Sequence, residues 1–328
     1  MKNFFRNYYF KEHLLGLIPN KLVGNYPVAK SNASITFLKK LTSNANTSSV
    51  SNLYNTDKNT VAVQRVVNFN VKNMSYRHAR NHADILKLLN VLIKRTDKNK
   101  ILSVPKIISV KETNKQLTIT REYIDGDVID EQAPELMNKA LVKCITTLRL
   151  LSKKLTNSEL LDIPSRGKIY TIAFFPVYCF KLIISDPIFI LSNLDLISLF
   201  YLCYLSTPGT ILLTISHRDL SPNNILVNNN RIFLIDFETT LLSEPETDIA
   251  IATMYFSKKM KLKIMTFLQQ FVKTNYQRDD YIRLSIFYIF QLLSNESKKS
   301  NYYEDTVKHG LFLKEKIIPE LNSWQLPD

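Results

Sequence analysis

The chain has 328 residues, of which 45% are hydrophobic and 22% are charged, a composition that indicates a folded soluble protein and excludes a disordered one. Its length is sufficient for a full hydrophobic core and favours two lobes over one. Lysine and arginine total 43 against 29 acidic residues, which gives a formal net charge of +14. This excess favours anionic partners such as nucleotide phosphates, nucleic acid or an acidic membrane surface. The alternative is that lysine is simply the common surface residue of this chain.

The cysteines and the N-terminus bear on where the protein works. Cys144, Cys179 and Cys203 are widely spaced and form no CxxC pair, so the sequence indicates neither a disulfide framework nor a zinc site. We therefore expect a reducing, cytoplasmic location. Residues 1–30 form an N-terminal extension that lacks the uninterrupted apolar region of a secretory signal. We expect this extension to cover the domain, and an amphipathic helix on a membrane is the alternative.

Residues 31–125 predict a small antiparallel sheet with one helix. Runs of β-type residues, separated by polar turns, occur at Ser34–Leu41, Val50–Tyr54, Thr60–Phe69, Val104–Val110 and Gln116–Glu122. Between the third and fourth runs, Ser75–Ile93 carries apolar residues at the three- and four-residue spacing of a helix. The loop Thr42–Ser49 between the first two runs contains no glycine. Its asparagines and serines favour either a phosphate-binding loop or a plain hairpin turn.

Residues 126–328 predict a mostly helical second lobe. Met137–Leu155 shows the helical spacing of apolar residues, and Ile169–Ile184 and Ile188–Leu205 are the most apolar stretches of the chain. The first of these contains a proline and a lysine, and the second contains an asparagine and an aspartate near its middle. Polar residues in mid-span are costly in a bilayer. We therefore expect buried helices of the larger lobe rather than a hairpin in a membrane.

One segment of this second lobe has a pattern that indicates phosphate chemistry. Two apolar runs, Ile225–Val227 and Ile232–Ile235, flank an asparagine-rich turn and predict a hairpin. This hairpin would bring Asn224 and Asp236 to the same open end. Amide and carboxylate oxygens at one place suit a hard cation such as Mg²⁺, which also binds phosphates. Asp219 lies in the preceding loop, where its carboxylate can face a substrate hydroxyl.

These residues carry a family resemblance. His217-x-Asp219-x-x-x-x-Asn224, followed by Ile235-Asp236-Phe237, resembles the catalytic loop and the metal-binding motif of the protein-kinase-like superfamily. Finer features are similar to its small-molecule branch, the aminoglycoside phosphotransferase and choline/ethanolamine kinase group. These features are Pro222-Asn-Asn-Ile-Leu226, Glu238 in place of the glycine of protein kinases, and Asp248-Ile-Ala250.

The resemblance implies an α+β, bilobal protein-kinase-like fold. The N-lobe, residues 31–125, would be the small antiparallel sheet that binds the nucleotide, and the C-lobe, residues 126–328, would be mostly helical and hold the catalytic loop. Asp219 would orient the acceptor hydroxyl and take its proton, and Asn224 and Asp236 would hold Mg²⁺ across the phosphates of ATP. The same resemblance implies that His217 and Asp248 support the loop and that Glu238 assists the metal or the substrate. It also implies a set of residues that bind the nucleotide: Arg65, Ser43, Asn44, Glu122 and Ile124.

The chain departs from the family pattern in its small lobe. Arg65 takes the place of the usual lysine, and a guanidinium is still able to clamp a phosphate. The helix glutamate that pairs with this cation in the family is replaced by His82, and Asp84 lies on another face of the helix. Either the register of the helix differs or the positioning ion pair is missing. We interpret His82 as an ordinary polar helix residue.

The leading hypothesis is an ATP- and Mg²⁺-dependent kinase that acts on a hydroxyl of a small molecule, such as an amino-alcohol, aminoglycoside, sugar or glycan precursor. Glu238 and nearby acids favour a cationic acceptor, whereas the net charge and the apolar region 169–205 favour an anionic or lipid-linked one at a membrane surface. The alternative is a catalytically impaired pseudokinase that acts as a binding or scaffold module. No motif indicates specific nucleic-acid binding. The sequence leaves open the acceptor, peripheral membrane contact, the choice between ATP and GTP, and the oligomeric state.

Overall fold

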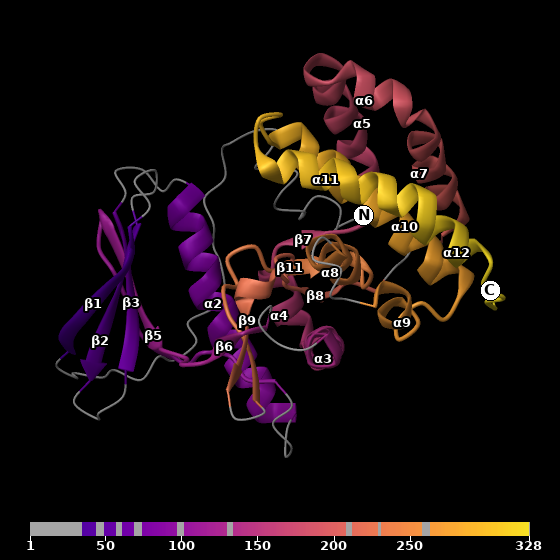
Figure 1. The fold of residues 1–328 in the computed structure, drawn as a ribbon. Coiled ribbons are helices and arrows are strands. Elements are labelled where there is room, and N and C mark those ends of the chain that lie inside the picture. Colours follow the sequence, from indigo (N-terminus) through magenta and orange to yellow (C-terminus); the bar gives the residue numbers. More distant parts are fainter. Residues whose placement is uncertain are drawn as a thin grey trace.

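A computed structural model describes the chain at residues 35–43, 49–56, 61–68, 74–96, 102–129, 134–207, 212–228, 231–257 and 263–327. It has a five-stranded sheet at one end and a mostly helical region with two three-stranded sheets at the other. Helix α2 (Met74–Thr96) lies between the two regions (Figure 1). The predicted N-terminal extension, residues 1–30, lies outside the described residues.

The five-stranded sheet has the strands and the order along the chain that the sequence predicts. Its strands are β1 (Ile35–Ser43), β2 (Ser49–Thr56), β3 (Val61–Asn68), β4 (Ile107–Glu112) and β5 (Gln116–Glu122). They pair antiparallel in the spatial order β1-β2-β3-β5-β4. The predicted fourth run begins later than expected, because Val104 and Pro105 precede the paired residues.

Helix α2 belongs to two hydrophobic clusters. Its first turns pack against the sheet, with Tyr76, Ala79 and Ala83 beside Val67 and Leu117. Its later turns contribute a run of buried leucines and isoleucine to the large core of the helical region. Burying apolar area on both sides of one helix stabilises the position of the sheet relative to the helical region. The division of the chain at residue 125 remains a prediction.

The connection between the regions runs from the end of β5 to β6 (Asp127–Val128). The amide of Tyr123 donates to the carbonyl of Val61 at 3.1 Å, so the connection is tied to the sheet. Strand β6 pairs with β9 (Ile225–Asn228). Gly126 meets this pair closely, because a Cβ at its position would lie 3.0 Å from the carbonyl oxygen of Val227. Glycine therefore permits the close approach of the two backbones.

The helical region is built from helices and short strands in the following order. They are α3 (Pro134–Ser152), α4 (Asn157–Asp162), β7 (Ser165–Arg166), α5 (Lys168–Ser185), α6 (Pro187–Ser192), α7 (Leu194–Ser206), β8 (Thr214–Ser216), the short helix η2 (Pro222–Asn224), β9, β10 (Arg231–Leu234), β11 (Leu241–Ser243), α8 (Thr247–Ser257), α9 (Ile264–Leu268), α10 (Asn275–Asn295), α11 (Asn301–Phe312), η3 (Leu313–Ile317) and α12 (Ile318–Asn322). Helix α10 is the centre of this region, since it packs against α5, α7, α8 and α11. Its aromatic side chains contact those of the neighbouring helices; for example, the rings of Phe175 and Phe290 are 5.1 Å apart.

The expectation that the two most apolar stretches are buried is wrong for their outer face. The side chains of Phe180, Ile184, Ile188, Leu191 and Leu205 are 62%, 71%, 75%, 69% and 77% exposed. Their helices are apolar on nearly every side, and the core covers only one side of each. The second stretch also forms two helices rather than one, because the chain breaks at the residue between α6 and α7. We call the outward side of these helices the α5–α7 apolar face. The three helices lie away from the five-stranded sheet (Figure 1).

A buried ion network stabilises the centre of the helical region. Arg283 of α10 is fully buried and donates to Asp280 at 2.7 Å, to Thr171 of α5 at 2.7 Å and to Glu244 after β11. Burial raises the pKa of Glu244, and the guanidinium of Arg283 opposes that shift. Removing one member of such a network leaves a buried charge without compensation.

We therefore expect Arg283→Met to lower the free energy of unfolding by about 3–5 kcal/mol, measured by urea denaturation. Arg278→Met is the matched control, because Arg278 pairs with Asp279 nearer the surface and such pairs are worth at most about 1 kcal/mol. An equal loss of unfolding free energy in both variants would contradict the proposed contribution of the buried network to stability.

Candidate active site

Asp248, at the start of α8, fixes the backbone of the loop that follows β8. Its Oδ1 accepts from the hydroxyl of Ser216 at 2.7 Å and from the amide of Arg218 at 2.9 Å. Its Oδ2 accepts from the amide of His217 at 3.0 Å. The carboxylate is 3% exposed, so these donors would otherwise be buried without partners. Asp248 thus lies where the sequence places a support of the loop.

His217 ties this loop to the segment after β10. Its Nε2 lies 2.9 Å from the carbonyl oxygen of Ile235, and its ring meets the edge of Phe237 with the ring centroids 4.8 Å apart. His217 is fully buried. The loop and the residues around Asp236 are therefore held against each other by a hydrogen bond and an aromatic contact.

The hairpin of β9 and β10 brings the predicted metal residues to one end. Its register pairs Leu234 with Ile225, and the amide of Ile235 donates to the carbonyl of Asn224 at 2.9 Å. The Nδ2 of Asn224 donates to the carbonyl and to the Oδ2 of Asp219, each at 2.9 Å. Asp219, Asn224 and Asp236 are consequently neighbours at the open end of the hairpin.

The two carboxylates of this group have different surroundings. Asp236 has a left-handed φ of 61°, and 46% of its side chain is exposed. Asp219 is more enclosed, so burial raises its pKa; His217 acts to lower it and Asp236 to raise it further. Burial and then the Asp219 carboxylate raise the pKa of Tyr255 in α8, which places that phenol beside Asp219.

The residues present fit a magnesium ion that is shared with phosphates. Because both hydrogen bonds of Asn224 to Asp219 come from its Nδ2, its Oδ1 is left to face a cation, together with the carboxylate of Asp236. Oxygen donors are those that Mg²⁺ prefers, and this ion usually takes one or two carboxylates plus water and substrate phosphates. Among the residues that the structure describes, no group of three or more His, Cys, Asp and Glu side chains could hold a metal, so phosphate oxygens would have to complete the site.

Arg65 of β3 has an acidic partner that the sequence did not reveal. Its Nη1 forms an ion pair with Oε1 of Glu238. Burial lowers the pKa of Arg65, and the nearby carboxylate of Asp236 opposes this shift. The sequence left open whether the positioning ion pair is missing. The pair exists, and its acid comes from the segment after β10 instead of from helix α2.

The helix position that lacks the glutamate is occupied by residues that bind the same segment by hydrogen bonds. His82 is 5% exposed, and its Nδ1 accepts from the amide of Phe237 at 3.0 Å. Asn81 donates to the carbonyls of Glu238 and Thr240, each at 3.0 Å. Burial, followed by the nearby arginines, lowers the pKa of His82 well below its usual value, so the ring is neutral and able to accept. His82 is a polar residue of the helix, as the sequence indicated, and in addition it is buried and holds the backbone of this segment.

The other predicted nucleotide residues are spread along the sheet and its exit. Glu122 pairs with Ala62 at the end of β5, and its Oε2 accepts from the amide of Lys106 at 3.2 Å. Ile124, 8% exposed, follows in the connection to β6. Ser43 ends β1 opposite Val50, and Asn44 lies outside the described residues. These assignments remain predictions.

Sequence reasoning missed two basic residues that face this site. One is Arg121 of β5. Burial lowers the pKa of Arg121, and the nearby carboxylate of Asp236 opposes this shift. Burial, Arg65 and Arg166 lower the pKa of His78 in α2, and Asp236 opposes them. Strand alternation gave a signal for Arg121, because it is two residues from the buried Ile119 and therefore on the same face of the sheet.

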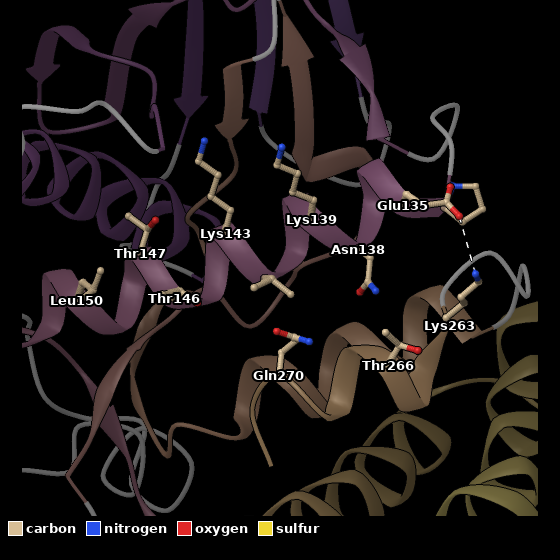
Figure 2. A pocket seen from close by; sticks show the side chains of 12 residues that line it. Glu135, Asn138, Lys139, Lys143, Thr146, Thr147, Leu150, Lys263, Thr266 and Gln270 are labelled. Atoms are coloured by element: carbon tan, nitrogen blue, oxygen red, sulfur yellow. Dashed lines mark ion pairs between the residues drawn. The ribbon is translucent and has the colours of Figure 1, made fainter. Parts of the chain in front are cut away.

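A cavity of about 660 Å³ lies elsewhere, between α3 and α9. Asn138 of α3 points toward Thr266 of α9 and Gln270 just after that helix, and Glu135 pairs with Lys263 at the end of the cavity (Figure 2). None of the predicted site residues lines it, so it has no part in the site described above.

Comparisons with known proteins agree with this geometry. Residues 211–271, which contain the loop, the hairpin and α8, match the family described as "Phosphotransferase enzyme family". No curated protein sequence matches the chain. Over residues 211–271 the family match confirms the predicted resemblance to phosphotransferases of the aminoglycoside type, whereas the resemblance to choline/ethanolamine kinases remains a prediction.

Solved structures of phosphotransferases share the fold. A thermostable aminoglycoside phosphotransferase (4)-Ia with ADP and hygromycin B has a TM-score of 0.58 and 14% identity, over 89% of this chain and 96% of its own. An amicoumacin kinase in complex with AMP-PNP, Ca²⁺ and Ami has a TM-score of 0.52 and 13% identity, over 86% of this chain and 87% of its own. A macrolide 2′-phosphotransferase type I has a TM-score of 0.53 and 12% identity, over 94% and 97%. The predicted α+β, kinase-like fold is confirmed.

The role of Asp248 leads to a prediction about stability. We expect Asp248→Ala to lower the free energy of unfolding by about 3 kcal/mol or more, because it leaves two buried backbone amides and a hydroxyl without an acceptor, at about 1–3 kcal/mol each. Asp195→Ala is the control, since Asp195 is 56% exposed and pairs with Lys314, so its loss should cost at most about 1 kcal/mol. The free energy of unfolding of both variants is measured by chemical denaturation. Equal stability of the two variants would refute the role assigned to Asp248.

Proposed function

We propose that this protein is a small-molecule kinase that transfers the γ-phosphoryl group of ATP to a hydroxyl of its acceptor. The observation that carries the proposal is the group formed by Asp219, Asn224 and Asp236 at the open end of the hairpin, with Asn224 bonded to Asp219. The family match covers these residues and supports the predicted class of enzyme, a phosphotransferase.

Each residue of this group has a proposed role. Asp219 accepts the hydrogen of the acceptor hydroxyl and orients its oxygen for in-line attack. Asn224 and Asp236 hold Mg²⁺, which neutralises phosphate charge when bound. Asn224 also holds the Asp219 carboxylate by its Nδ2, so one amide links the acid that faces the acceptor to the metal residues.

Arginine side chains of the five-stranded sheet would contact the phosphates of the nucleotide. Arg65 and Arg121 both lie close enough to Asp236 for that carboxylate to act on their charges. Glu238 holds Arg65 in place, as the helix glutamate does for the cation of the family pattern. Related structures contain ADP or AMP-PNP, and one contains GDP, so the choice between ATP and GTP remains open.

The alternative of a catalytically impaired pseudokinase rested on the apparent lack of a positioning ion pair. The pair of Arg65 and Glu238 removes that argument. The second argument, the loop without glycine, concerns residues of which 44–48 lie outside the described part of the chain. An active enzyme is therefore the better-supported function.

We also propose that the protein is cytoplasmic and contacts a membrane peripherally. The α5–α7 apolar face supports this contact, because a group of exposed large apolar residues of this extent usually marks an interaction surface. Helix α5 is long and apolar enough to span a bilayer, but 33% of its apolar window is buried in the protein. Lys181, an exposed residue of α5, suits anionic lipid head groups.

The role of Asp219 is tested by Asp219→Asn. We expect turnover of ATP with an accepted hydroxyl compound to fall by about 10²–10⁴-fold, because the base is lost. Stabilisation of the protein by Mg·AMP-PNP, measured as a rise in melting temperature, should persist, since ligand binding to the native state stabilises it. Asp195→Asn, an exposed substitution of the same type, serves as the control. Undiminished turnover in Asp219→Asn would refute the assignment.

Membrane contact is tested by co-sedimentation with vesicles that contain phosphatidylglycerol. We expect the wild type to sediment with them and Ile184→Asp to remain largely in solution, because a charge replaces an apolar side chain that is 71% exposed. Leu212→Asp is the control: its side chain is similarly exposed, at 75%, but lies outside α5–α7. Equal sedimentation of the wild type and Ile184→Asp would rule out this face as the contact.

A further inference from the structure

A second cavity, of about 460 Å³, lies beside the candidate active site. Helix α5 forms one side of it with Tyr178 and Lys181, and the end of α10 contributes polar amides. The other sides come from His78 of α2, Arg166 of β7 and Arg218 of the catalytic loop. The cavity thus joins parts of the chain that are far apart in sequence.

The cavity begins within one residue of the proposed base. Arg218 directly precedes Asp219, and Thr239, another lining residue, donates to the carbonyl of His217 at 3.0 Å. His78 lies close enough to Arg65 and Arg166 for both charges to act on its pKa. The cavity therefore borders the loop that carries Asp219.

The charged side chains that line the cavity are all basic. Among its described lining residues are two arginines, a lysine and a histidine, and none is acidic. Arg166 is only 8% exposed, and its guanidinium lies over the ring of Tyr170 at 4.6 Å. A guanidinium at the wall of the cavity can form charge-assisted hydrogen bonds to an anion that binds there.

Arg218 keeps a side chain at a position where the backbone disfavours one. Its φ is 62°, in the left-handed region where glycine is the unstrained residue. A non-glycine residue there costs about 1–3 kcal/mol. The carboxylate of Asp248 binds only the backbone amide of this residue, and a glycine would make that bond equally well. The arginine side chain lies over the ring of Tyr288, 5.8 Å from its centroid, and it lines the cavity.

We propose that this cavity binds the acceptor through an anionic group of the phosphate type, held by Arg166, Lys181 and Arg218, and positions a hydroxyl of the same molecule at Asp219. The proposal rests on the proposed kinase function and names its class of substrate: an anionic hydroxyl compound in place of a cationic one.

The anion has two sources with the same chemistry, a free phosphate ester and a lipid head group. Helix α5 contributes Lys181 to the cavity, while Phe180 and Ile184 of the same helix belong to the α5–α7 apolar face. A lipid head group could therefore reach the cavity while its chains remain next to that face. The experiment includes one probe for each source.

The test measures equilibrium binding, which requires no turnover, to protein saturated with Mg·AMP-PNP so that the nucleotide phosphate site is filled. The probes are glycerol 3-phosphate, a small compound with both a phosphate and hydroxyls, phosphatidylglycerol in vesicles, and glycerol as the neutral analogue. The variants are Lys181→Glu, Arg218→Gly and the control Lys153→Glu. Lys181 and Lys153 are both exposed, so the same change of charge is made inside and outside the cavity; glycine suits the left-handed backbone at residue 218 and preserves the fold.

We expect the wild type and Lys153→Glu to bind glycerol 3-phosphate or the vesicles, and Lys181→Glu and Arg218→Gly to bind the same probe at least about tenfold more weakly, which corresponds to about 1.4 kcal/mol. Glycerol should not bind detectably. The probe that binds identifies the source of the anion. The proposal is overturned if neither phosphate probe binds, if glycerol binds as well as they do, or if Lys181→Glu retains wild-type affinity. Failure of the kinase function would appear separately, as absent stabilisation by Mg·AMP-PNP.

Discussion

The site depends on the hydrogen bonds that hold the backbone of residues 235–240 between the two regions of the protein. His217 contacts the carbonyl of Ile235 from the catalytic loop, while Asn81 and His82 of α2 bind the amide of Phe237 and the carbonyls that follow it. Asp236 has a left-handed φ within this segment, a conformation that costs about 1–3 kcal/mol and persists only where its surroundings fix it. A shift of α2 would therefore move Asp236 and Glu238 together, and with Glu238 the guanidinium of Arg65.

Much of the fold could be predicted because local sequence determines it. The valine-rich run of β3, the helical spacing of α2 and the asparagine-rich turn between β9 and β10 each specify their element without distant partners. Hydropathy was less informative for α5–α7, because it gives the amount of apolar surface but not the side on which other elements cover it. Exposed side chains such as Phe180 could be found only from the packing.

The site, like the fold, could be predicted where it depends on residues close in the sequence and not where it depends on distant ones. Asp219, Asn224 and Asp236 are close in the chain and joined by one hairpin, so their spacing was sufficient. The ion pair of Arg65 with Glu238 joins residues far apart in sequence, and the resemblance pointed to an acid on helix α2 instead. His82 was underestimated for the same reason: its value lies in accepting from a backbone amide, and a backbone amide has no signature in the sequence.

The pairing of Glu238 also changes the argument about the acceptor. As a free acid beside the catalytic loop, Glu238 would favour a cationic substrate. Bound to Arg65, it contributes little net charge, and Asp236 faces Arg65 and Arg121 on the nucleotide side. On the other side of Asp219, the charged side chains that line the cavity are basic. Under the proposed function, the acids of the site would serve the metal and the arginines of the sheet, and an acceptor in the cavity would meet basic side chains. A cationic acceptor would have to overcome the field of these side chains, whereas an anionic one would be attracted by it.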